Sequence, residues 1–365
     1  MRSSHSRNNF KVLVFGAGAI GAYIGGSLIL AGHDVVFVER PRNVRDLRTR
    51  GMQLDLSIDP KRNTRDACII EPRLFVAADS LAAALDQGPF DVAVFALKSY
   101  DTPAALEDIK PRAEKLPPVL CLSNGVENES LLAKILGQNR VIHGTVTTAV
   151  GRRGPGQITL EKLRGMGVAA GHPLSETLAA VFDDAYLKCI LYPEPHSMKW
   201  SKMLTNLVAN PTSAILDMTP RQIFANKKLY RVEIDMLKEC VDVMQAKGLK
   251  VVDPPGTPGR ALALATILPP WLSRPFFSRL AARGRGGKMP SFHIDLYSGR
   301  GKSEVEYLHG AVVRAGKECG VSTPVNQFLT ETLLALTRKE IPFEEYAHQP
   351  EKLLQALDQY RKNVH

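Results

Sequence analysis

The sequence has few cysteines, and they do not form the patterns typical of disulfide-rich or zinc-binding proteins. Five cysteines, an odd number, are spread over 365 residues, and four of them lie inside apolar or helix-like stretches. This distribution predicts neither a disulfide framework nor a metal site. The five residues are Cys68, Cys121, Cys189, Cys240 and Cys319.

The sequence also lacks a long apolar run. A membrane-spanning helix needs ~20 predominantly apolar residues, and the apolar run at 261–268 is far shorter. Residues 1–9 are polar and basic, without the apolar core of a signal peptide. We therefore expect residues 1–9 to form a flexible tail, the chain to have no membrane span, and the protein to be cytoplasmic.

Acidic residues are outnumbered. The 37 Asp and Glu stand against 47 Lys and Arg, which gives a formal net charge of +10. This balance favours an anionic partner, which could be nucleic acid, a membrane surface, or a phosphate-bearing cofactor with a carboxylate substrate. Because the basic residues are scattered and form no recognisable nucleic-acid-binding motif, we expect a small-molecule partner and no nucleic acid.

The beginning of the chain has the pattern of a βαβ unit. Residues 10–15 are apolar and β-rich, residues 19–31 have a helical pattern that ends at Gly32, and residues 35–38 form a second strand-like run. Further strand-like runs follow, most of them separated by helix-like segments, at 91–97, 119–122, 141–146, 155–160, 168–170 and 186–191. This alternation predicts an α/β fold, with a Rossmann-type doubly wound parallel sheet over residues 10–193.

The rest of the chain, residues 194–365, has long helical patterns, clearest at 229–247 and 304–319. These patterns predict a mostly α-helical second domain. Residues 254–290 stand apart as a basic insertion rich in Pro and Gly. The composition leaves open whether this insertion packs between helices, acts as a lid or contacts a membrane surface.

A glycine-rich turn lies between the first strand and the first helix. Gly16, Ala17, Gly18, Ala19, Ile20 and Gly21 have the G-x-G-x-x-G spacing. The first glycine of this motif permits a tight turn, the second lets the backbone approach a pyrophosphate, and the third allows close packing of helix on strand. Because the helix N-terminus also offers amide groups to phosphates, the turn predicts a dinucleotide site.

About 20 residues further on, an acidic residue selects NAD in such sites, whereas an arginine accepts the 2′-phosphate of NADP. The chain has both signals there, in Glu39, Arg40 and Arg42. Glu39 could hold the ribose hydroxyls, while the arginines favour a phosphate through charge-assisted hydrogen bonds. We expect NADP (NADPH) as the cofactor, with Arg40 as the phosphate ligand.

Four later segments together resemble the ketopantoate reductase family, and they cover both predicted domains. They are ALKSY at 96–100, SNGVEN at 123–128, KWSKMLTNLVANP at 199–211, and residues 291–310. The resemblance implies that Lys98 lies near the cofactor, and that Asn124 contacts both the cofactor and the substrate. It also implies that Ser291 donates to the substrate carboxylate and that Glu304 is a catalytic polar partner.

Lys202, Asn206 and Asn210 are spaced four and four apart, which on one helix gives a single polar row. Hydride reduction of a ketone creates an alkoxide, and an ammonium group can stabilise and protonate it. Lys202 fits this role and matches the family's catalytic lysine. The two asparagines would bind substrate oxygens.

Some positions depart from the family pattern. The stretch from Asp295 to Glu304 is one residue longer than usual, His309 stands where the family generally has Asn, and Glu306 replaces an Asp. The resemblance implies NADPH-dependent reduction of ketopantoate to pantoate, in pantothenate synthesis, and these departures bear on the substrate rather than on the reaction type. The alternatives are a paralogue acting on another 2-oxo acid or an imine, and a non-catalytic cofactor sensor. A homodimer is left open.

Overall fold

The computed structural model describes residues 9–62, 64–275, 277 and 289–364. The chain divides into two compact units. The sheet unit comprises Met1–Ser123, Asn128–Pro195 and Pro254–Gly256, and the helical unit comprises Asn124–Glu127, His196–Asp253 and Thr257–His365.

The main sheet of the sheet unit has eight strands in the order β12-β11-β8-β7-β6-β1-β2-β5. The six strands from β8 to β5 are mutually parallel, and β11 is antiparallel to β8. Their sequence order across the sheet is that of a Rossmann fold, so the predicted fold class is confirmed. The strands are β1 (Lys11–Phe15), β2 (Asp34–Val38), β5 (Val76–Ala78), β6 (Val92–Phe95), β7 (Val119–Cys121), β8 (Val141–Val146), β11 (Met166–Ala169) and β12 (Cys189–Tyr192).

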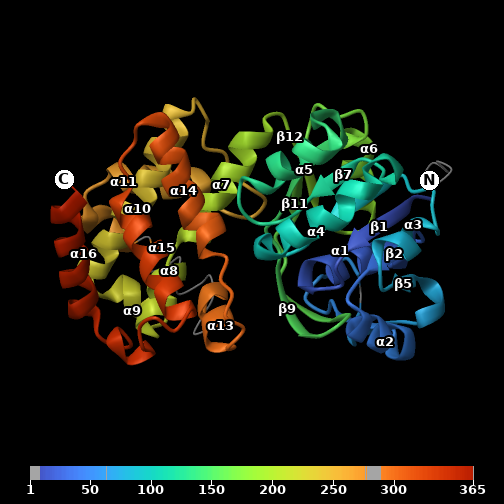
Figure 1. The fold of residues 1–365 in the computed structure, drawn as a ribbon, viewed down its shortest axis with the longest axis horizontal. Coiled ribbons are helices and arrows are strands. Elements are labelled where there is room, and N and C mark those ends of the chain that lie inside the picture. Colours follow the sequence, from blue (N-terminus) through green and yellow to red (C-terminus); the bar gives the residue numbers. More distant parts are fainter. Residues whose placement is uncertain (1–8, 63, 276, 278–288, 365) are drawn as a thin grey trace. The chain divides into compact units, whose positions relative to one another are not determined.

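Alternate residues of each central strand enter different cores, because successive side chains of a strand point to opposite faces. Val12 and Val14 of β1 join one core, and Leu13 and Phe15 join the other. The first core includes residues of α1 (Ala19–Leu30), α2 (Pro41–Arg50) and α6 (Ser175–Asp184). The second includes residues of α3 (Leu81–Leu85), α4 (Thr102–Ile109) and α5 (Asn128–Leu136), so helices cover both faces of the sheet (Figure 1).

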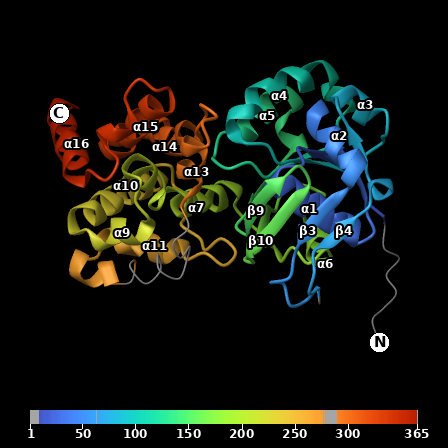
Figure 2. The same cartoon turned by 90° about the horizontal axis from the view of Figure 1, so that it is seen from below.

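A second, four-stranded sheet has the order β4-β3-β10-β9, and Figure 2 shows these strands side by side. The run at 155–160 was expected to be a strand of the first domain, and the strand that forms there belongs to this second sheet. Its partners were not predicted, since the pairing joins segments about 100 residues apart in the chain. The strands are β3 (Met52–Asp55), β4 (Cys68–Ile70), β9 (Ala149–Gly154) and β10 (Gln157–Lys162).

The helical unit surrounds a single apolar core (Figure 1). Its long helix α10 (Lys227–Ala246) buries Leu229, Leu237 and Met244 there, as expected for an amphipathic pattern. A mostly α-helical second unit was predicted, and this is confirmed. The other helices are α7 (Pro195–Leu207), α8 (Asn210–Leu216), α9 (Pro220–Ala225), α11 (Gly259–Ile267), α13 (Ser291–Tyr297), α14 (Val305–Cys319), α15 (Pro324–Thr337) and α16 (Pro350–Val364).

The basic insertion is only partly covered by the structure, since residues 276 and 278–288 lie outside the described residues. Of the remainder, α11 buries Leu262 and Ala265 against the helical core. Trp271 is 77% exposed. Among the described residues, we find no helix with the length and apolar character needed to cross a membrane.

Candidate functional site

The glycine-rich turn joins β1 to α1 and has the geometry that its spacing predicts. Gly16 has φ +88°, which favours glycine, and its amide donates to the carbonyl of Val38 at 2.9 Å. A Cβ on Gly21 would lie 1.8 Å from the carbonyl oxygen of Gly16, whereas a Cβ on Gly18 would meet no atom within 4 Å. Gly21 thus allows α1 to pack against the turn, and the space beside Gly18 is open to a ligand.

Glu39, which directly follows β2, stabilises this turn by accepting a hydrogen bond from it. One carboxylate oxygen accepts the Ala17 amide at 2.8 Å, and the other accepts the Arg40 amide at 2.8 Å. The Arg40 guanidinium pairs with Asp101 at 3.1 Å, and its side chain is 73% exposed. Both carboxylate oxygens of Glu39 therefore accept hydrogen bonds from the protein backbone, while the Arg40 side chain lies at the surface.

Gly16, Arg40 and Lys98 follow the carboxyl ends of three neighbouring parallel strands, β1, β2 and β6. Ligands of open α/β sheets bind beyond those ends. Lys98 is half-buried and precedes the 3-10 turn Ser99–Asp101. The hydroxyl of Ser123 donates to the carbonyl of Leu97 at 2.8 Å, which ties the end of β7 to that of β6.

Four polar residues that were predicted to bind substrate meet in the helical unit. The side-chain amide of Asn206 donates to Asn124 Oδ1 at 3.3 Å. The side-chain amide of Asn210 donates to the backbone carbonyl of Asn206 at 3.0 Å and to Ser291 Oγ at 3.4 Å. We refer to Asn124, Asn206, Asn210 and Ser291 as the asparagine cluster. Its members come from three separate segments of the sequence, around residues 124, 206–210 and 291.

The predicted single helical row is wrong in one respect. Helix α7 ends at Leu207, and α8 begins at Asn210, with Ala209 in the left-handed conformation between them (φ +50°). Lys202 and Asn206 share one face of α7, but Asn210 belongs to the next helix. Proline at position 211 explains the break, because in a continuous helix it would lack the amide that bonds to the Leu207 carbonyl, and its ring would clash with that carbonyl.

Lys202 is half-buried on α7, one turn before Asn206, so it faces the same side as the asparagine cluster. Glu304 is 1% exposed and is the N-cap residue of α14, which begins at Val305 rather than at Glu304. The hydroxyl of Ser303 accepts the Val305 amide at 3.2 Å.

One contact at the site was missed by the sequence analysis. Arg314 of α14 forms a two-pronged ion pair with Glu127, at 2.8 and 2.6 Å, and so holds the segment that carries Asn124. The hydrogen bonds that Arg314 donates to the Glu127 carboxylate raise the pKa of Arg314. Glu127 lies in the SNGVEN segment, but nothing near it in the sequence indicates a partner 187 residues away.

His309, which departs from the family pattern, is fully buried. Its Nδ1 lies 2.9 Å from Asn326 Oδ1. The Asn326 amide donates to Met236 O and to Glu239, so its oxygen is the acceptor and His309 Nδ1 the donor. Burial lowers the pKa of His309 to about 3, and the imidazole is therefore neutral.

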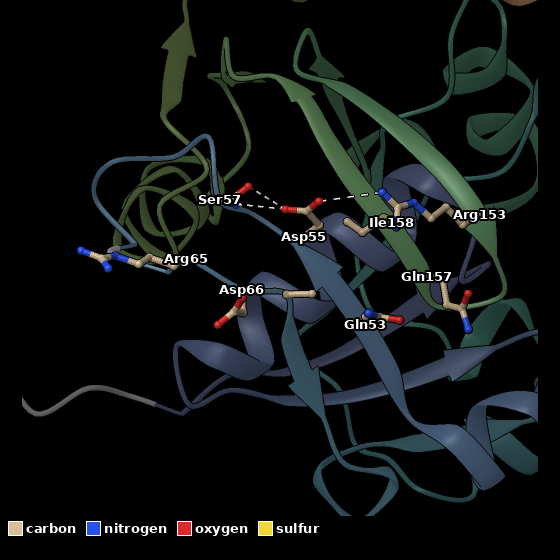
Figure 3. A pocket seen from close by; sticks show the side chains of 9 residues that line it. Gln53, Asp55, Ser57, Arg65, Asp66, Arg153, Gln157 and Ile158 are labelled. Atoms are coloured by element: carbon tan, nitrogen blue, oxygen red, sulfur yellow. Dashed lines mark hydrogen bonds and ion pairs between the residues drawn. The ribbon is translucent and has the colours of Figure 1, made fainter.

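A separate pocket of about 250 Å³ lies on the four-stranded sheet. In Figure 3, Ser57 and Arg153 point toward the carboxylate of Asp55, at 2.7 and 3.9 Å. The pocket contains none of the predicted site residues. Over the ranges that the structure describes, no group of three or more His, Cys, Asp or Glu could hold a metal ion.

Comparison with known proteins finds similarity over most of the chain. The family model for ketopantoate reductase PanE/ApbA matches residues 12–171, and the model for its C-terminal part matches residues 196–337. A 2-dehydropantoate 2-reductase of Streptococcus pyogenes is 23% identical, over 89% of this chain and 97% of its own.

Solved structures show the same architecture. A PanE/ApbA family ketopantoate reductase from Ralstonia eutropha has a TM-score of 0.75 at 28% identity, covering 90% of this chain and 99% of that one. D-mandelate dehydrogenase, solved with NADH and anilino(oxo)acetate, has a TM-score of 0.71 at 20% identity, with the same coverage. From the two family models, which together span most of the sequence, it follows that the chain belongs to the ketopantoate reductase family.

Proposed function

We propose that this protein reduces a 2-oxo acid, with ketopantoate as the first candidate, by hydride transfer from NADPH to the 2-keto carbon. The observation that carries the proposal is the asparagine cluster beside Lys202. The cluster supplies neutral hydrogen-bonding groups and Lys202 supplies an ammonium, which is the set that a carboxylate and a ketone oxygen require. The product would be pantoate, an intermediate of pantothenate synthesis.

In this proposal each residue has a distinct task. Ser291 and Asn210 bind the substrate carboxylate, and Asn124 and Asn206 bind its remaining oxygens. When bound, the nicotinamide supplies the hydride. Lys202 stabilises the alkoxide that forms and delivers a proton to its oxygen. Glu304, which is buried at the start of α14, is assigned as the second catalytic residue, a polar partner in the substrate site.

The proposal assigns the cofactor to the sheet unit, through Gly16, Ala17, Gly18, Ala19, Ile20, Gly21 and Lys98. Asn124, which belongs to the helical unit, is assigned to bind the cofactor as well as the substrate. NADP is proposed rather than NAD because the Arg40 side chain is 73% exposed and, although one of its nitrogens is paired with Asp101, it keeps further donors for a 2′-phosphate, whereas both oxygens of Glu39 already accept backbone amides. The NADH in the D-mandelate dehydrogenase structure keeps NAD as the alternative. The proposal keeps residues 10–193 as the cofactor domain and 194–365 as the catalytic domain.

The test is turnover by the purified protein. NADPH and then NADH are supplied with ketopantoate and with a panel of other 2-oxo acids, and nucleotide absorbance at 340 nm is followed. We expect oxidation of NADPH, fastest with a branched 2-oxo acid. Oxidation with another acid alone supports the paralogue. Binding of NADPH without turnover of any acid would support a cofactor sensor and contradict the proposal.

A further inference from the structure

The chain makes an abrupt change of direction where the asparagine cluster forms. Between α7 and α8, Ala209 has φ +50° and ψ +19°, and it is completely buried. This left-handed conformation is unfavourable for residues with a side chain. Contacts from elsewhere in the fold must therefore hold Ala209 in this conformation.

Glu233, on α10, supplies those contacts. One of its carboxylate oxygens accepts the Ala209 amide at 2.7 Å, and the other accepts the Thr212 hydroxyl at 2.5 Å. The side chain is fully buried, and burial raises its pKa to about 7, while the two hydrogen bonds lower it. A buried carboxyl group is costly, and it is retained where its hydrogen bonds define a geometry.

The two partners of Glu233 flank Asn210 in the sequence. Asn210 is 2% exposed, and its oxygen accepts the Phe292 amide at 3.0 Å. Its amide group reaches Ser291 Oγ and the carbonyl of Asn206. The hydrogen bonds of Glu233 at this break thus fix the position of Asn210. Asn210 in turn connects α7 to the first turn of α13 through its own hydrogen bonds.

We propose that Glu233 is a positioning residue for substrate binding: by fixing the break between α7 and α8, it sets Asn210 and Ser291 in the geometry that receives the substrate carboxylate. This inference rests on the proposed function. Glu233 touches no substrate in this scheme, and its effect reaches the site through Ala209, Thr212 and Asn210.

Glu239 offers a matched control on the same helix. It is also a buried carboxyl group whose pKa is raised to about 7 by burial. Its partners are the amides of Val325 and Asn326, at 2.8 and 2.9 Å, at the start of α15 rather than at the α7–α8 break. We therefore expect substitution of either glutamate to lower stability, but only substitution of Glu233 to disturb substrate positioning.

The first experiment compares Glu233→Ala with Glu239→Ala. Both variants should unfold at lower urea concentration than the parent. Glu233→Ala should lower kcat/KM for the 2-oxo acid by roughly 10²-fold, because a misplacement of about 1 Å has effects of that size. It should raise KM and leave the Kd of NADPH unchanged, whereas Glu239→Ala keeps kcat/KM within about twofold. Equal losses of kcat/KM in the two variants would overturn the proposal.

Two further variants cover the case in which Glu233→Ala does not fold. Glu233→Gln keeps an acceptor for the Ala209 amide and presents an NH2 group to the Thr212 oxygen, so it should recover most of the activity. Thr212→Val removes one of the two contacts and should raise KM while the protein stays folded. Parental KM values in Thr212→Val and a full loss of activity in Glu233→Gln would each contradict the proposal.

Amide hydrogen exchange gives a readout that does not depend on turnover. Glu233→Ala or Thr212→Val should speed exchange of the Phe292 amide, which is bonded to Asn210, and Glu239→Ala should leave it unchanged. Unchanged Phe292 exchange in a folded Glu233→Ala protein refutes the positioning role. If the parent reduces no 2-oxo acid, the proposed function fails, while this measurement still decides whether Glu233 positions Asn210.

Discussion

Replacing Gly21 and Gly18 by alanine, one at a time, separates the two roles proposed for glycine in the glycine-rich turn. A Cβ on Gly21 would lie 1.8 Å from the Gly16 carbonyl oxygen and 3.3 Å from a methyl group of Val14. The first distance is more than 1 Å too short, and the obstacle is backbone rather than a flexible side chain. Helix α1 would have to move away from the turn.

The magnitude follows from two opposing effects. Alanine is favoured over glycine inside a helix by ~1 kcal/mol. Forcing an extra methyl group into a close-packed contact costs ~1–3 kcal/mol, and a rigid obstacle puts the cost at the upper end. We therefore expect Gly21→Ala to lower the free energy of unfolding by ~2 kcal/mol, and to weaken NADPH binding because the turn is displaced.

Gly18→Ala is the matched control. Its Cβ would meet no atom within 4 Å, and its φ of −72° suits any residue. Stability should therefore be unchanged, while NADPH affinity falls by roughly tenfold, ~1.4 kcal/mol, because the methyl group occupies space that the pyrophosphate needs. Urea unfolding followed by circular dichroism measures stability, and fluorescence titration measures affinity. The reasoning is refuted if Gly18→Ala destabilises the protein more than Gly21→Ala does.

Three other predictions concern single side chains. Lys202→Ala should lower kcat by roughly 10²- to 10⁴-fold, the range for a general acid, with the Kd of NADPH unchanged; turnover near the parental rate would show that the proton comes from another group. Arg40→Ala should remove the preference for NADPH over NADH in titrations of both nucleotides, and equal affinities in the parent would promote Glu39 as the selecting residue. Burial lowers the folded-state pKa of His309 to about 3 from 6.5 in the free side chain, so the unfolded chain binds more protons at this position and the contribution of His309 to stability falls as pH drops from 6.5 toward 3. His309→Asn should flatten that slope in urea titrations, and parallel slopes would contradict the neutral, buried imidazole.

The local parts of the fold could be predicted from sequence. The turn at Gly16 and Gly21 lies between an apolar run and a helical pattern, and its geometry depends on residues within one short segment. Lys98 and Asn124 each follow a strand by two or three residues, which is enough to place them beyond the carboxyl ends of their strands.

Features that depend on distant partners could not be predicted in this way. The four-four spacing of Lys202, Asn206 and Asn210 fits one continuous helix, and Pro211 was the local sign against it. Nothing near Ala209 in the sequence indicates its left-handed conformation, because the group that accepts its amide is Glu233, 24 residues later. The pairing of β3 with β10 is of the same kind.

The return of residues 254–256 to the sheet unit means that this unit is not a portable module. The Thr147 hydroxyl donates to the carbonyl of Pro255 at 2.6 Å, and Pro255 also packs against Gly165, just before β11. A fragment cut near residue 193 would keep every strand of both sheets, yet it would expose the surface that Pro254–Gly256 covers. An excised sheet unit would therefore need this tripeptide grafted back, and recombining the two units of related enzymes would require a match at residues 254–256 as well as at the boundary near residue 195.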